Sequence, residues 1–120
     1  MKNIVYETQE SFYDYIGRVV QGSETIANYL REDKIGEAMQ LIIQFSEGVS
    51  WLIKVIILMK DHNYHININP DQMNEFLVEI NDGLERQDYV IVADMFEYEI
   101  KPFLEEAAKE KFYLTGEENH

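Results

Sequence analysis

The chain of 120 residues contains no cysteine, which excludes disulfide bonds, thiolate zinc sites and cysteine nucleophiles. This composition is compatible with the cytoplasmic location that we expect. Basic residues are also scarce, because 10 Lys and Arg stand against 23 Asp and Glu and give a net charge of −13. A surface with this charge repels phosphate backbones and anionic lipids. We therefore expect neither nucleic acid nor a membrane as a partner.

The sequence lacks the patterns that carry several common functions. It has no run of about 18 uninterrupted apolar residues, so we expect no transmembrane helix. The six glycines are scattered and form no phosphate-binding loop. None of the serines lies on a Gly-x-Ser-x-Gly turn. We therefore expect that the protein is not an enzyme and that it binds no cofactor.

The acidic residues are concentrated in the second half of the chain. Residues 1–60 have a net charge of −2, whereas residues 61–120 have a net charge of −11. This asymmetry would attract a basic partner, although solubility is the simpler explanation.

The strongest pattern that is present lies in residues 35–59. Apolar residues recur there at alternating spacings of three and four, which is typical of a helix in the seam of a bundle. The positions are Ile35, Ala38, Ile42, Phe45, Val49, Leu52, Ile56 and Met59. Between Trp51 and Met59 only Lys54 is polar, so this helix has more apolar surface than one buried face requires.

Similar periodicity predicts helices at about residues 8–31, 34–62, 70–86 and 89–112, with a polar tail at 115–120 that we expect to fray. The connections between the first two and the last two helices are very short, so each pair should pack antiparallel. The predicted fold is all-α, a single domain over residues 1–120 with an antiparallel up-down-up-down four-helix bundle. The predicted N-caps are Thr8, Asp33, Asn69 and Asp88.

Two local features interrupt this pattern. Residues 63–69 alternate like a strand that has no partner, so we expect an extended crossing in which Ile66 and Ile68 lie on the bundle. Pro102 falls inside the fourth predicted helix, on its outer side, where a proline kinks a helix.

Metal binding has only weak support. The four predicted seams contain no carboxylate and the chain has no Glu-x-x-His, which argues against a carboxylate-bridged di-iron site. Asp61, His62 and His65 are weak candidates for binding a divalent cation. A solvated helix end favoured by the helix dipole is the more common reason for such residues.

Aligned apolar residues on two outer surfaces are the best functional candidate. The outermost line of the second helix is polar, but Ile43 and Ile57 flank it on one side and Trp51 and Leu58 on the other. The fourth helix has a similar outer stripe. Aligned exposed apolar residues indicate an interface, unless the loop 63–69 and the termini cover them. The predicted interface residues are Ile43, Trp51, Ile57, Leu58, Ile91, Met95 and Tyr98.

Two segments carry a resemblance to a known family. One is Met95-Phe96-Glu97-Tyr98-Glu99-Ile100-Lys101-Pro102-Phe103-Leu104-Glu105-Glu106, and the other is Glu47-Gly48-Val49-Ser50-Trp51-Leu52-Ile53. Together they resemble a family of small, functionally uncharacterised helical proteins from Gram-positive bacteria. The resemblance implies a helical bundle and no known activity. In architecture alone, the layout is also similar to flagellar export chaperones, which are four-helix bundles that wrap a disordered segment of flagellin.

Three hypotheses follow from the sequence. The first is a non-enzymatic interaction protein that self-associates, most simply as a homodimer. The second is a monomeric adaptor or export-type chaperone that binds an amphipathic segment of another protein chain. The third is a metal-binding protein or enzyme that uses Asp61, His62 and His65. In a simple up-down bundle the second and fourth helices lie on a diagonal, so their apolar stripes need not form one surface.

Overall fold

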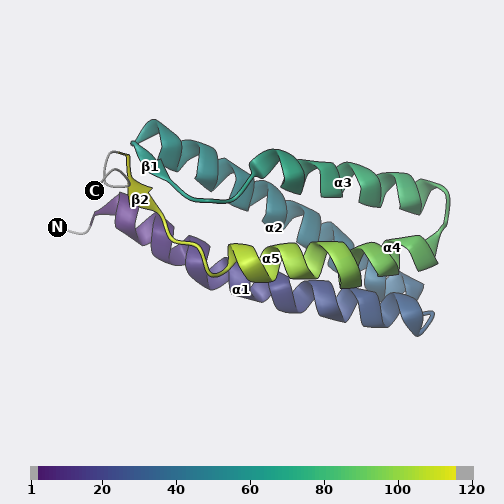
Figure 1. Cartoon of the computed structure of the whole chain (residues 1–120). Helices are drawn as coiled ribbons and strands as arrows, with labels where there is room; N and C mark the ends of the chain where they lie inside the picture. Colours follow the sequence, from purple (N-terminus) through teal and green to yellow (C-terminus); the bar gives the residue numbers. More distant parts are fainter. Residues whose placement is uncertain (1–2, 116–120) are drawn as a thin grey trace.

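The computed structural model describes residues 3–115 and is mainly helical, as predicted. Figure 1 shows that the last three helical elements form one continuous rod, so four helical rods make up the fold. The elements are α1 (Ile4–Arg31), α2 (Ile35–Asp61), β1 (Tyr64–His65), α3 (Pro70–Glu85), α4 (Tyr89–Met95), the π-helix η1 (Phe96–Ile100), α5 (Lys101–Ala107) and β2 (Tyr113–Leu114). The predicted all-α class is therefore confirmed.

The first helix begins one turn earlier than predicted. Its N-cap is Asn3, whose side chain accepts a hydrogen bond from the backbone N–H of Val5 at 2.9 Å. The prediction of Thr8 as the cap is wrong, because Thr8 lies inside the helix and its hydroxyl donates to the carbonyl of Ile4. Asparagine caps a helix at least as well as threonine, so the earlier start is the favourable one.

Two of the three N-caps predicted at the turns between helices are confirmed. Asn69 and Asp88 are confirmed as caps, since their side chains accept hydrogen bonds from the N–H groups of Asp71 and Ile91. Asp33 is not a cap. It has a φ of 63°, in the left-handed region, because the chain reverses direction there, and Lys34 occupies the cap position without a side-chain bond.

The rod formed by α4, η1 and α5 differs from the predicted helix in two ways. It ends at Ala107 rather than at residue 112, and it contains a π turn. The N–H of Lys101 donates to the carbonyl of Phe96, five residues earlier, directly before Pro102, which cannot donate. The π turn contains one residue more than an α turn, so it changes the phase of the helix. Leu104 is therefore fully buried while Phe103 is only partly buried.

The segment after α5 returns to the loop that follows α2. β2 pairs antiparallel with β1, with His65 opposite Tyr113, and Thr115 donates to the carbonyl of Asn63 from both its N–H and its hydroxyl. The prediction that the loop lacks a partner is therefore wrong, as is the predicted fraying at Thr115; residues 116–120 lie outside the described residues. Ile66 and Ile68 are buried on the helices as predicted.

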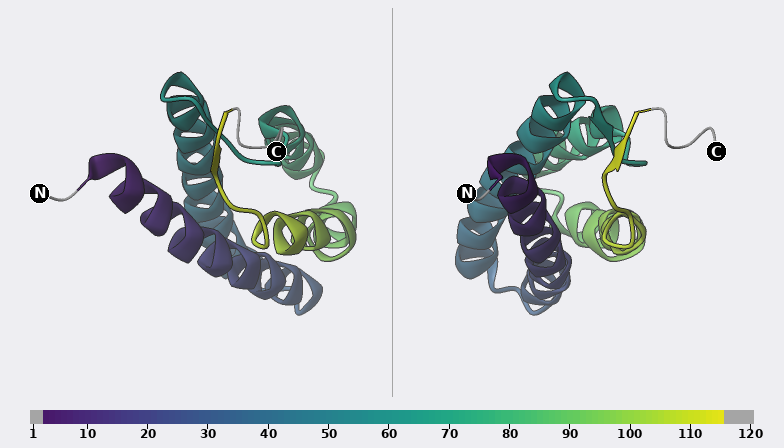
Figure 2. Two further views of the ribbon diagram at one scale, coloured as in Figure 1. Left: turned by 60° about the vertical axis from the view of Figure 1, so that its left-hand side comes forward. Right: turned by 90° about the vertical axis from the view of Figure 1, so that its left-hand side faces the viewer.

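The helices enclose one core. α1 packs against α2, α4 and α5, whereas α2 also packs against α3, and α3 against α4. Figure 2 shows α1 and α2 diverging toward the start of α1. The largest fully buried side chains are Phe12, Phe96, Ile16, Ile26, Leu52, Met59, Met73, Ile80, Ile100 and Leu104.

The helix α2 is also long and apolar enough to cross a membrane, judged by length and composition alone. The absence of a long uninterrupted apolar run therefore does not by itself exclude a transmembrane helix here. The core helix of a soluble protein passes the same test, and nine residues of α2 are buried against the rest of the chain.

Candidate functional site

The structure places six of the seven predicted interface residues on the surface. They are Ile43, Trp51, Ile57, Leu58, Ile91 and Tyr98. Met95 is only 5% exposed, so the expectation that it lies on the outer stripe is wrong. Met95 lies in α4, which packs on both α1 and α3, so the buried face of this helix is wider than the single seam that the heptad pattern assumes.

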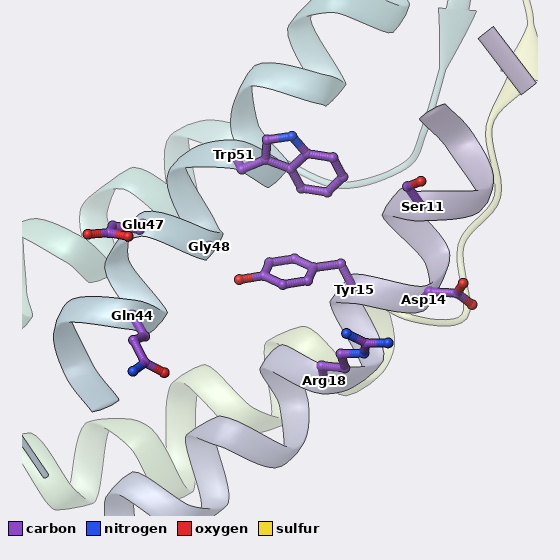
Figure 3. Close-up of a pocket in the computed structure, with 8 residues that line it drawn as sticks. All are labelled: Ser11, Asp14, Tyr15, Arg18, Gln44, Glu47, Gly48 and Trp51. Carbon is purple, nitrogen blue, oxygen red and sulfur yellow. The ribbon is translucent and has the colours of Figure 1, made fainter. Parts of the chain in front are cut away.

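A groove lies between α1 and α2 and has a volume of about 620 Å³. Figure 3 shows the ring of Tyr15 reaching from α1 toward α2, with Trp51 beside it. The two rings meet edge to face, with centroids 5.5 Å apart and an interplanar angle of 81°. The residues that line the groove are Ser11, Asp14, Tyr15, Arg18, Gln44, Glu47, Gly48 and Trp51.

Gly48 allows Tyr15 to lie on α2. A Cβ atom at position 48 would overlap the Tyr15 hydroxyl and would lie 2.8 Å from the ring atom Cε2. The close approach of the two helices at this point therefore depends on the absence of a side chain at Gly48. The helix sequence accepts a glycine here although glycine lowers helix stability by ~1 kcal/mol relative to alanine.

This contact predicts different effects for two glycine substitutions. Gly17 is exposed in α1 with no atom within 4 Å of a built Cβ, so Gly17→Ala should raise the free energy of unfolding by ~1 kcal/mol. Gly48→Ala should lack this gain, because the Tyr15 ring has to move. Urea denaturation followed by circular dichroism measures both. Equal stabilisation by the two substitutions would show that Tyr15 does not rest on Gly48.

The groove continues toward the start of α1. A second hollow of about 420 Å³ shares Ser11 and Trp51 with the first and extends to Ile4 and Leu58. Sequence reasoning missed the α1 side of this surface. The apolar periodicity of α1 does not distinguish Tyr15 from its other half-buried residues, and a tyrosine opposite a glycine on the neighbouring helix is the signal that could have indicated the contact.

The outermost line of α2 is exposed and polar, as the sequence predicts. Glu47 and Lys54 lie on this line, and within residues 3–115 neither takes part in an ion pair. The apolar side chains on both flanks are all exposed, from 37% for Trp51 to 58% for Ile43. The loop 63–69 and β2 therefore leave this face of α2 uncovered.

The outer stripe on α4 and η1, which contains Ile91 and Tyr98, differs from the face of α2. The acidic residues beside this stripe form ion pairs within the chain. Arg31 of α1 pairs with Asp94 at 2.8 Å and with Glu97 at 3.1 Å. Hydrogen bonding to the hydroxyl of Tyr98, and then the Arg31 guanidinium, lower the pKa of Glu97, and the same contact with Glu97 raises the pKa of Tyr98. The α2 face is therefore the stronger candidate for contact with another molecule.

The weak metal candidates are not brought together. Asp61 ends α2, His62 follows it as the C-cap, and the ring of His65 stacks on Tyr113 in the two-stranded sheet. Over the part of the chain that the structure describes, no three His, Cys, Asp or Glu side chains form a group that could hold a metal ion.

Comparison with known protein families identifies the family of this chain. Neither the curated proteins nor the solved structures contain a significant match to the chain. A family model matches residues 7–110, from the first turn of α1 to beyond the end of α5. This agrees with the resemblance to a functionally uncharacterised family. The chain therefore belongs to the family described as "Domain of unknown function (DUF8042)".

Proposed function

We propose that this protein is a non-enzymatic, cytoplasmic interaction module that associates with a second copy of itself. The observation that carries the proposal is the uncovered face of α2, where Trp51, Leu58, Ile43 and Ile57 are exposed in two lines. Aligned apolar side chains of this kind mark interfaces, and tryptophan is enriched at their energetic centres. Symmetric dimers are the commonest oligomers, which favours a second copy as the partner.

The fold supports this role. The order of the helices, their short connections and their packing neighbours are consistent with an up-down-up-down antiparallel bundle. In such a bundle α2 is held by its neighbours α1 and α3 and presents its remaining face as a rigid surface. The groove beside it is lined by Tyr15, Trp51 and Gly48 together with five polar or charged residues. Within residues 3–115 no serine or threonine hydroxyl is hydrogen-bonded to a histidine.

Light scattering after size-exclusion chromatography tests the proposal. The 14.2 kDa chain is expected to elute with the mass of a dimer at micromolar concentration. Trp51→Ser should raise the dimer Kd at least about 10-fold, because a central tryptophan contributes more than ~1.4 kcal/mol to such an interface. The helical circular dichroism spectrum should be retained.

Val78→Ser is the matched control, because Val78 is 62% exposed on α3, away from the α2 face. This variant should remain a dimer. A wild-type protein that is monomeric at every concentration would overturn the proposal and favour a monomeric adaptor. A Trp51→Ser variant that dimerises as tightly as the wild type would also contradict it.

A further inference from the structure

The outer face of α2 has an internal symmetry that specifies how a second copy would bind. We define this face by its exposed side chains, which run along three parallel lines of the helix. The central line is Gln40, Glu47, Lys54 and Asp61; one flank is Ile43, Ser50 and Ile57; the other flank is Gln44, Trp51 and Leu58. We propose that two copies pair through this face with their α2 helices antiparallel, about a two-fold axis that passes between Ser50 and Trp51.

The central line supplies the first part of the argument. When two antiparallel helices are related by a two-fold axis, residues equally distant from the axis on either side lie opposite each other. Glu47 precedes the point between Ser50 and Trp51 by the same distance by which Lys54 follows it. Each Glu47 is therefore placed opposite the partner's Lys54, and the symmetry forms this ion pair twice.

The midpoints of the two flanks, Ser50 and Trp51, lie on either side of the same axis. The axis is perpendicular to the plane of the two helices, so each flank meets the same flank of the other copy. Ile43 and Ile57 are equally distant from Ser50, so Ile43 lies beside the partner's Ile57. On the other flank Trp51 lies beside the partner's Trp51. The small Ser50 at the axis allows the two helices to approach closely.

Charge selects the antiparallel arrangement. Among the described residues Glu47 and Lys54 have no ionic partner in the single chain, so both are available. In a parallel pair of α2 helices Glu47 would face Glu47 and Lys54 would face Lys54. These like charges would repel each other, whereas the antiparallel pair places opposite charges together. The inference rests on the proposed self-association and adds its geometry.

Charge reversal tests the register. Glu47→Lys or Lys54→Glu alone converts both ion pairs into like-charge contacts and should raise the dimer Kd about 10-fold at low salt. The double variant Glu47→Lys/Lys54→Glu restores both pairs and should return to within about 3-fold of the wild type. An equimolar mixture of the two single variants should form a heterodimer more tightly than either forms a homodimer. Glu79→Lys, an equal change of charge on the exposed side of α3, should leave the Kd unchanged.

A single introduced thiol tests the position of the axis independently. The chain has no cysteine, so Ser50→Cys supplies one thiol per chain, close to its symmetry mate. Mild oxidation should produce a disulfide-linked dimer. The control is Gln40→Cys, which is also exposed on α2 but is placed opposite the partner's Asp61 and should not cross-link. A parallel pair would cross-link at both positions.

The outcomes separate the inference from the proposed function. A wild-type dimer that is indifferent to Glu47→Lys and does not cross-link through Ser50→Cys would overturn the antiparallel register while self-association stands. A wild-type protein that is monomeric in light scattering at every concentration would overturn both. Restoration by the double variant together with cross-linking at position 50 alone would establish the inference.

Discussion

Phe96→Ala is expected to lower the free energy of unfolding by about 3–5 kcal/mol. Phe96 has no exposed surface and begins the π turn at the centre of the last helical rod. Its ring meets that of Phe45 edge to face, with centroids 5.0 Å apart. Alanine would remove this contact and leave a cavity between α2 and η1. Such cavities collapse only in part, because the surrounding side chains are close-packed.

Urea denaturation at neutral pH measures this loss. Tyr98→Ala is the matched control, because Tyr98 is an aromatic residue of the same π turn but is 66% exposed. Its replacement should change stability by no more than about 0.5 kcal/mol. Similar losses in the free energy of unfolding for the two variants would show that Phe96 contributes no more to the core than the exposed Tyr98 does.

Gly83→Ala is expected to destabilise the protein although alanine is the better helix former. Gly83 is buried in α3, and a Cβ atom there would lie 2.7 Å from Cγ2 of Val92 in α4. Val92 is fully buried, and its branched side chain has little rotamer freedom in a helix. Overpacking of this kind costs about 1–3 kcal/mol, whereas the gain in helix propensity is ~1 kcal/mol. We therefore expect a net loss, in contrast to the gain from Gly17→Ala.

A double-mutant cycle with Val92→Ala identifies the cause. Val92→Ala alone should destabilise by creating a cavity. The combined variant should be more stable than the sum of the two losses predicts, because the new methyl group occupies part of the space vacated by the valine. Strict additivity would show that Gly83 and Val92 are not in contact.

The sequence predicted those parts of the fold that depend on local chemistry. Apolar periodicity located four helices, and the caps Asn69 and Asp88 are as expected because capping depends on a few adjacent residues. The pairing of β1 with β2 could not be predicted in this way, because it joins two-residue segments that are far apart in the chain. The π turn was also missed, since a proline indicates a disturbance in a helix but not its form.

The same distinction applies to the candidate site. Trp51 and Leu58 were placed on an outer surface because their exposure depends only on the phase of α2. Met95 was misplaced because α4 packs on two helices, α1 and α3, and the pattern of one helix does not show how wide its buried face is. The contact of Tyr15 with Gly48 depends on how α1 crosses α2, and single-helix patterns do not contain that angle.

The π turn has a consequence for how sequences of this family align. It lies where the rod passes from α4, which packs on α1 and α3, to α5, which packs on α1 and contacts α3 through the rings of Phe76 and Phe103. A π turn contains one residue more than an α turn, so removal of one residue from it restores a continuous α-helix. A relative that lacks this residue would therefore show a one-position gap near residues 96–100. That gap would indicate a regular α-helix in the relative and not the loss of a helix. The buried positions after the gap would then lie on a different side of that helix.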